Sequence, residues 1–145
     1  MPLLLDLQGH VKDALKSGDA ARAGVLRMMV SEIKNKEIEK RTAGGDSVLS
    51  DEEIMDVLRK EVKKRRESAD LFRQGNRADL AEGEEKEIAL IEGYLPAAPT
   101  EDDIRKVVSE LRAQGIDQFP ALMKEAMPRL KGADGAVVSR IVKEG

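Results

Sequence analysis

Apolar residues recur every three or four positions along most of this chain, and that spacing is typical of amphipathic helices. The first set of apolar positions with this spacing predicts a helix over residues 3–17 that ends at Gly18. The next set predicts a helix that Asp19 caps and that extends to about Arg41. The apolar positions of these two helices are Leu4, Leu7, Val11, Leu15, Val25, Leu26, Met29, Val30 and Ile33. No segment shows a convincing strand pattern, so the chain is predicted to be all-α.

Two further helices follow a flexible break at "AGGDS", residues 43–47. The pattern from Ser50 to Glu53 is typical of a capping box and opens the third helix. The turn "QGN" at residues 74–76 separates the third helix from the fourth. The inward positions of this pair are predicted to be Ile54, Leu58, Val62, Ala69, Phe72, Leu80, Ile88, Ile91 and Leu95. Residues 1–96 are therefore expected to form a four-helix N-terminal domain.

The segment "YLPAAPT", residues 94–100, marks the predicted domain boundary because its two prolines cannot continue a helix. Thr100 is placed to cap a fifth helix, Gly115 to end it, and Pro128 to bend the sixth helix or end it early. The seventh helix has its apolar positions at Val137, Val138, Ile141 and Val142. The pattern thus predicts a C-terminal three-helix domain over residues 97–145.

Composition narrows the functional classes. The chain has no cysteine and one histidine, His10, so thiol nucleophiles and cysteine- or histidine-rich metal sites are excluded. No apolar run approaches the roughly 20 residues that span a membrane, and a soluble cytoplasmic protein is expected. The serines are scattered and no nucleotide-binding loop is present. The sequence therefore predicts no catalytic residue, no metal site and no cofactor.

A cluster of positive charge lies in the third helix, where "RKEVKKRR" covers residues 59–66. Arg59, Lys63 and Arg66 fall on one stripe of that helix. Two interpretations remain open: a solvated face balanced by nearby glutamates, or a stripe that contacts phosphates. The net charge of the chain is −3, so any RNA contact is expected to be local.

A second candidate is the basic turn before the last helix, within "AMPRLKGADGAVVSRIV". Arg129 and Lys131 flank it, and Gly132 and Gly135 allow the backbone to approach a ligand closely. Asp134 is placed to cap the seventh helix, whose first N–H groups favour an anion. The turn is interpreted either as a plain helix junction or as a phosphate-binding site.

Several motifs resemble the GatB/YqeY family along essentially the whole chain. They are "RMMVSEIKNKEIEK" at residues 27–40, "RKEVKKRRESADLFRQGNRADLAEGEEKEIALIEGYLP" at residues 59–96, and the pattern of Met127-Pro128, Leu130-Lys131-Gly132 and Ala133-Asp134-Gly135. The second half is similar to the tail of the B subunit of the tRNA-dependent amidotransferase, and the resemblance identifies the chain with the stand-alone YqeY-like branch.

That resemblance implies a helical module that associates with tRNA but lacks the amidase and ATP-using centres of the larger enzyme. Two alternatives stay open: an accessory component of glutamine-dependent carbon–nitrogen ligase activity within a complex of amidotransferase subunits, and a protein-interaction scaffold without RNA binding. Two basic positions of the family pattern are absent here, since Pro120-Ala121 stands before Leu122-Met123 and Gly132 is followed directly by Ala133. Residues 101–145 have no net charge, so they carry no excess positive charge to attract RNA. The scaffold alternative therefore stays open.

Overall fold

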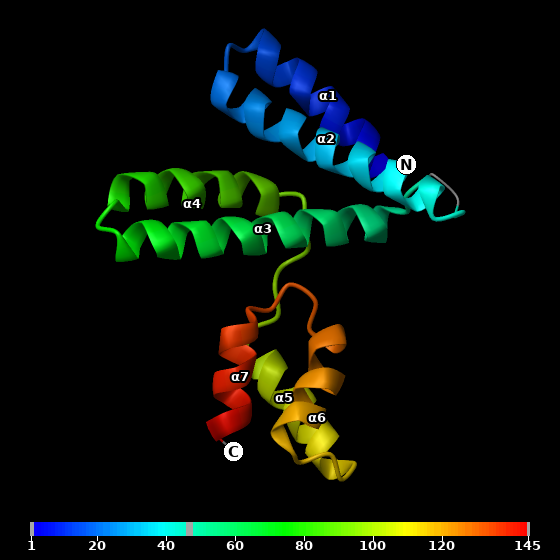
Figure 1. Ribbon diagram of the computed structural model, residues 1–145, viewed down its shortest axis with the longest axis vertical. Coiled ribbons are helices and arrows are strands. Elements are labelled where there is room, and N and C mark those ends of the chain that lie inside the picture. The colour runs from blue at the N-terminus through cyan, green and yellow to red at the C-terminus, as the bar shows by residue number, and fades with distance from the viewer. Residues whose placement is uncertain (1, 46–47, 145) are drawn as a thin grey trace. The chain divides into compact units, whose positions relative to one another are not determined.

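The computed structural model describes residues 2–45 and 48–144, and helices are the only regular elements in these residues (Figure 1). The predicted all-α class is confirmed. The contacts divide the chain into two compact units, residues 1–95 and residues 96–145. That division falls one residue before the boundary predicted from the two prolines, and each unit has a hydrophobic core of its own.

The first helical hairpin of unit 1 pairs α1 (Pro2–Lys16) with α2 (Ala20–Thr42), which lie side by side in Figure 1. Gly18 makes the sharp turn between them with a φ of +78°, a conformation that costs glycine little because it has no Cβ. The side chain of Asp19 accepts a hydrogen bond from the backbone N–H of Arg22, 3.1 Å away. Asp19 is therefore the N-cap of α2, as the sequence predicts.

The second hairpin pairs α3 (Asp51–Gln74) with α4 (Ala78–Glu92). Ser50 and Glu53 form the predicted capping box: the Ser50 hydroxyl accepts from the Glu53 N–H, and the Glu53 carboxylate accepts from the Ser50 N–H. The turn to α4 has Asn76 in the left-handed region, with a φ of +59°. Asparagine tolerates this conformation better than most residues.

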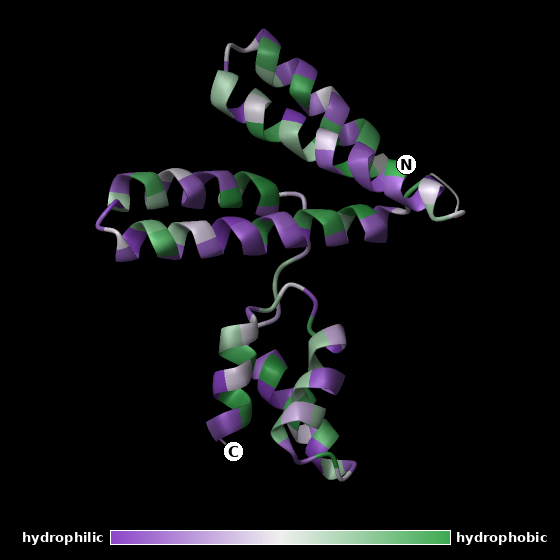
Figure 2. Cartoon of the chain, viewed as in Figure 1, coloured by the Kyte–Doolittle hydropathy of each residue, from purple (hydrophilic) through white to green (hydrophobic). Residues whose placement is uncertain are grey.

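The two hairpins share one core. Its largest fully buried side chains are Leu7, Leu26, Met29, Ile33, Leu49, Ile54, Leu58 and Ile91. Figure 2 shows the corresponding alternation of hydrophobic and hydrophilic residues along the helices. Two predicted inward positions are wrong: Leu15 is 48% exposed and Leu80 is 40% exposed. The neighbouring Ala14 and Ala81 are fully buried instead, so alanines rather than leucines take these two inward positions.

Unit 2 consists of α5 (Glu101–Ala113), α6 (Phe119–Ala126), a short 3₁₀ turn η1 (Met127–Arg129) and α7 (Gly135–Glu144). Pro128 lies in η1, so the α-helical part of the sixth helix ends early, as predicted. The core of the unit comprises Ile104, Val108, Leu111, Leu122, Ala126, Leu130, Val138, Ile141 and Val142. Arg112 donates a hydrogen bond of 2.7 Å to the Val142 carbonyl, one of the carbonyls that the end of α7 leaves without a helical partner.

Thr100 and Asp103 form a second capping box, at the start of α5. The backbone N–H of Thr100 holds the pKa of Asp103 below its ordinary value. The backbone N–H of Ser50, assisted by Lys40, does the same for the pKa of Glu53. Both pKa values are lower in the folded state than in the unfolded state. The two carboxylates therefore stabilise the folded protein fully at a pH above their unfolded-state pKa values of about 4. This stabilisation is lost as the pH falls through the folded-state values.

We therefore expect thermal stability to fall on acidification below about pH 4. In Glu53→Gln and Asp103→Asn that fall should be shallower, since neither amide titrates. Melting temperatures followed by circular dichroism between neutral and acidic pH measure the slope. An unchanged slope in both variants would show that other carboxylates dominate the acid response.

Candidate nucleic-acid interface

The basic turn of unit 2 connects η1 to α7. The side chain of Leu130 anchors it in the core, with 3% of its surface exposed. Gly132 has a φ of +89°, and a Cβ at this position would lie 3.9 Å from Ala98 and Pro99. The turn thus packs against the extended segment before α5, and its backbone conformation favours glycine.

Asp134 caps α7, as predicted. Its carboxylate accepts a hydrogen bond from the N–H of Ala136 at 2.9 Å, and its carbonyl accepts from Val137 at 3.0 Å. The start of the helix, which was expected to offer free N–H groups to an anion, already holds the carboxylate of this residue. An incoming phosphate would meet that negative charge.

Gly135 is placed differently from Gly132. It is the first residue of α7 and does not have a positive φ. A Cβ added to Gly135 would meet only the terminal methyl group of Met127, at an ordinary contact distance of 3.8 Å. Of the two glycines in the predicted site, only Gly132 has a positive φ, so only at this position does the backbone conformation favour glycine.

Arg129 and Lys131 are both exposed beside this turn. The nearest carboxylate to Arg129 is that of Glu125, whose Oε2 lies 3.9 Å from Nη2, at the outer limit of an ion pair. An exposed pair of this length contributes little to stability. The structure therefore brings Arg129, Lys131 and Gly132 together on one exposed turn, with Gly135 next to them.

The stripe on α3 is less accessible to a ligand. Arg59 is 18% exposed and is paired with Glu52 at 3.1 Å and with Asp56 at 2.8 Å. Arg66 lies 3.6 Å from Glu92 of α4. Lys63 is exposed and makes no ion pair with any described residue. Two of the three predicted cations are thus already paired with carboxylates.

The remaining arginines of α3 tie it to α4. Arg65 is paired with Glu61 at 3.2 Å, with Glu84 at 3.4 Å and with Glu87 at shorter range. Arg73 is paired with Glu85 at 2.5 Å. Together with Arg66, these pairs join the last third of α3, residues 65–73, to residues 84–92 of α4. The solvated-face interpretation of "RKEVKKRR" fits these contacts better than a row of free cations does.

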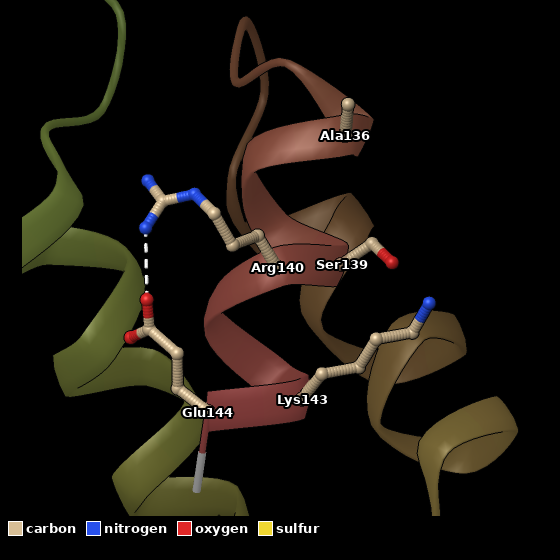
Figure 3. Close-up of a pocket in the computed structure, with 5 residues that line it drawn as sticks. All are labelled: Ala136, Ser139, Arg140, Lys143 and Glu144. Carbon is tan, nitrogen blue, oxygen red and sulfur yellow. Dashed lines mark hydrogen bonds and ion pairs between the residues drawn. The ribbon is translucent and has the colours of Figure 1, made fainter.

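The exposed side of α7 has a feature that the sequence analysis missed: an open depression lined by Ala136, Ser139, Arg140, Lys143 and Glu144 (Figure 3). Arg140 is paired with Glu144 at 2.8 Å and, at shorter range, with Glu101 of α5. The hydrogen bond from Arg140 lowers the pKa of Glu101 below its ordinary value. Lys143 lies 5.3 Å from the centroid of the Phe119 ring. The charged residues that line this depression are two cations and one carboxylate, and Arg140 is already held between Glu101 and Glu144.

Comparison with known proteins agrees with the family resemblance that the sequence motifs indicate. The model of the family described as "Yqey-like protein" matches residues 5–145. The chain belongs to this family. "Altered inheritance of mitochondria protein 41, mitochondrial" from Lachancea thermotolerans is 34% identical over 86% of this chain and 66% of its own length. The proteins of the same name from Clavispora lusitaniae and Eremothecium gossypii are 32% identical over 96% of this chain and 35% identical over 66% of it.

This YqeY-like chain spans 82% of the Clavispora relative but only about half to two thirds of the first relatives it matches. Their names describe mitochondrial proteins, and the cytoplasmic location expected from the sequence is therefore wrong. The expectation depended on the lack of a membrane-spanning stretch, which does not distinguish one aqueous compartment from another. Within the described residues, no helix combines the length and the apolar character needed to cross a membrane.

Proposed function

We propose that this YqeY-like protein is a non-catalytic helical module that associates with tRNA. The observation that carries the proposal is the exposed turn of unit 2. Arg129 and Lys131 stand there beside Gly132, in the part of the chain that resembles the tail of the amidotransferase B subunit. Exposed Arg and Lys side chains are a usual means of contacting phosphates.

The carboxylate of Asp134 offers a sharp test of this turn. Asp134→Asn keeps a capping oxygen for α7 and removes one negative charge. If phosphates dock here, this substitution should tighten tRNA binding, whereas Arg129→Ala combined with Lys131→Ala should weaken it. The slope of log affinity against log salt should flatten by about one unit or slightly less for each phosphate contact that is lost.

The experiment is a titration of the full chain with unfractionated tRNA at several salt concentrations. Lys106→Ala combined with Lys124→Ala is the matched control, because it removes two exposed lysines of the same unit that are not part of the turn. Equal binding by the turn variant and the wild type would remove the turn from the site. No binding by the wild type at low salt would overturn the tRNA proposal and favour the scaffold alternative.

A second candidate function is that of an accessory component in glutamine-dependent amide transfer. The resemblance to an amidotransferase subunit favours it. Co-purification of amidotransferase subunits with the tagged full chain, independent of RNA, would support this role. The two candidates are separated by treating the lysate with ribonuclease before the capture step, because a partner bound only through tRNA is then lost.

A further inference from the structure

The outward face of α2 carries a row of positions with a distinctive composition. Spacings of three and four residues place Ala20, Gly24, Arg27, Ser31, Lys34, Ile38 and Arg41 along one side of the helix. All seven are exposed. The row contains three cations and no acid, although the chain as a whole has a net charge of −3.

The three cations of this row are available, unlike the arginines of α3. The side chains of Arg27, Lys34 and Arg41 make no ion pair or hydrogen bond with any residue in the described parts of the chain, 2–45 and 48–144. Glu37 flanks the row, is half-buried, and likewise makes no ion pair there. The positive charge is therefore not cancelled by contacts within unit 1.

The geometry of the row suits an elongated ligand. Each cation follows the previous one by seven residues, or about 10 Å along the helix axis, and the row as a whole is about 30 Å long. Asn35 and Thr42, both exposed, lie beside it. The buried side of α2 is a different one, which includes Leu26 and Met29 of the shared core, so the row remains uncovered in unit 1.

We infer that this face of α2, defined by Arg27, Lys34 and Arg41, is a second RNA-contacting surface that binds the sugar–phosphate backbone. The set of side chains decides the occupant: Arg, Lys, Ser, Asn and Thr are the types that contact phosphate and sugar oxygens. Protein interfaces are enriched in aromatic residues, methionine and arginine and depleted of lysine. This row has two arginines but no aromatic residue and no methionine, its central cation is Lys34, and its single large apolar side chain is Ile38. The inference rests on the proposed RNA association and places a site on unit 1.

Direct readout of bases is not expected from this surface. The row has no aromatic side chain on which a base could stack, and its cations are spread along a single helix. We therefore expect binding that depends strongly on salt and little on RNA sequence.

The test measures binding of unfractionated tRNA to the full chain with Arg27, Lys34 and Arg41 all changed to Ala. Affinity at low salt should fall roughly tenfold or more, and the salt slope should flatten by about two to three units. The matched control changes Lys12, Lys16 and Lys86 to Ala, which removes the same charge from exposed positions of unit 1 that make no ion pair with a described residue and lie outside both candidate surfaces of this unit. Thermal melts of both variants should match the wild type, because exposed unpaired charges contribute little to stability.

The outcomes separate this inference from the proposed function. Loss of binding in the α2 variant but not in the control supports the surface, and Lys34→Glu should then weaken binding more than Lys34→Ala. If the wild type and the α2 variant bind tRNA equally, the inference falls and the proposed RNA association stands. If the wild type binds no tRNA, both fall. A helical peptide with glutamates at heptad spacing is a further probe: binding of the peptide alone, lost in the α2 variant, would overturn the inference in favour of an acidic protein partner.

Discussion

Leu122→Ala is expected to unfold the C-terminal unit while the N-terminal unit stays folded. Leu122 is fully buried at the centre of α6, in a core that α5, η1 and α7 complete. Truncating a buried leucine to alanine costs about 2–5 kcal/mol. A three-helix unit of 50 residues rarely has more than about 3–5 kcal/mol of stability. One substitution therefore removes most or all of the stability of this unit.

The measurement is an amide NMR spectrum of the full chain, which reports each unit separately. Signals of residues 96–145 should collapse to unfolded positions, and those of residues 1–95 should keep their dispersion. Leu71→Ala is the control with the same chemical change: Leu71 is 66% exposed, and such surface substitutions alter stability by less than about 0.5 kcal/mol. If both units lose their dispersion together in Leu122→Ala, the chain folds as one cooperative unit and the two-domain prediction is wrong.

Gly132→Val is expected to destabilise the same unit through its backbone. The φ of +89° at this position is disfavoured for any residue with a Cβ, and most strongly for a β-branched one. Holding a residue in such a region costs about 1–3 kcal/mol. The substitution also strains the turn that presents Arg129 and Lys131, so tRNA binding at that turn should weaken with it.

The matched control is Gly135→Ala, three residues away. Gly135 begins α7 and has room for a methyl group, so alanine should be neutral or slightly stabilising. Chemical denaturation followed by circular dichroism compares the two variants. Equal stability of Gly132→Val and the wild type would show that the turn adopts another backbone conformation in solution.

Features that depend on a few neighbouring residues could be predicted from the sequence. The caps at Asp19, Ser50, Thr100 and Asp134 are confirmed, because the hydrogen bonds of an N-cap join residues two or three positions apart. Pro128 ends the α-helical part of the sixth helix for an equally local reason. The all-α class and the family follow from periodicity and motifs along one chain, without knowledge of its long-range contacts.

Other features were decided only when the helices packed. The sequence does not show which of Ala14 and Leu15 faces the core, because both lie near the boundary of the apolar stripe and the approach of α2 selects between them. It also does not show which cations are paired. Arg65 meets Glu84 and Glu87 across the hairpin, 19 and 22 residues away, so these contacts exist only after α3 and α4 close.

For the candidate sites too, some features could be predicted from the sequence and others depended on the tertiary structure. The sequence by itself determined that the chain is a helical YqeY-like protein, where most of its helices begin, and which basic residues merit attention. Tertiary structure decided that Arg66 is paired with Glu92 of α4, that Gly132 rather than Gly135 has the positive φ, and that Arg27, Lys34 and Arg41 of α2 are exposed with no ion-pair partner among the described residues. The physical reason is that backbone caps and helical periodicity are local, whereas the availability of a charge depends on every element that packs near it.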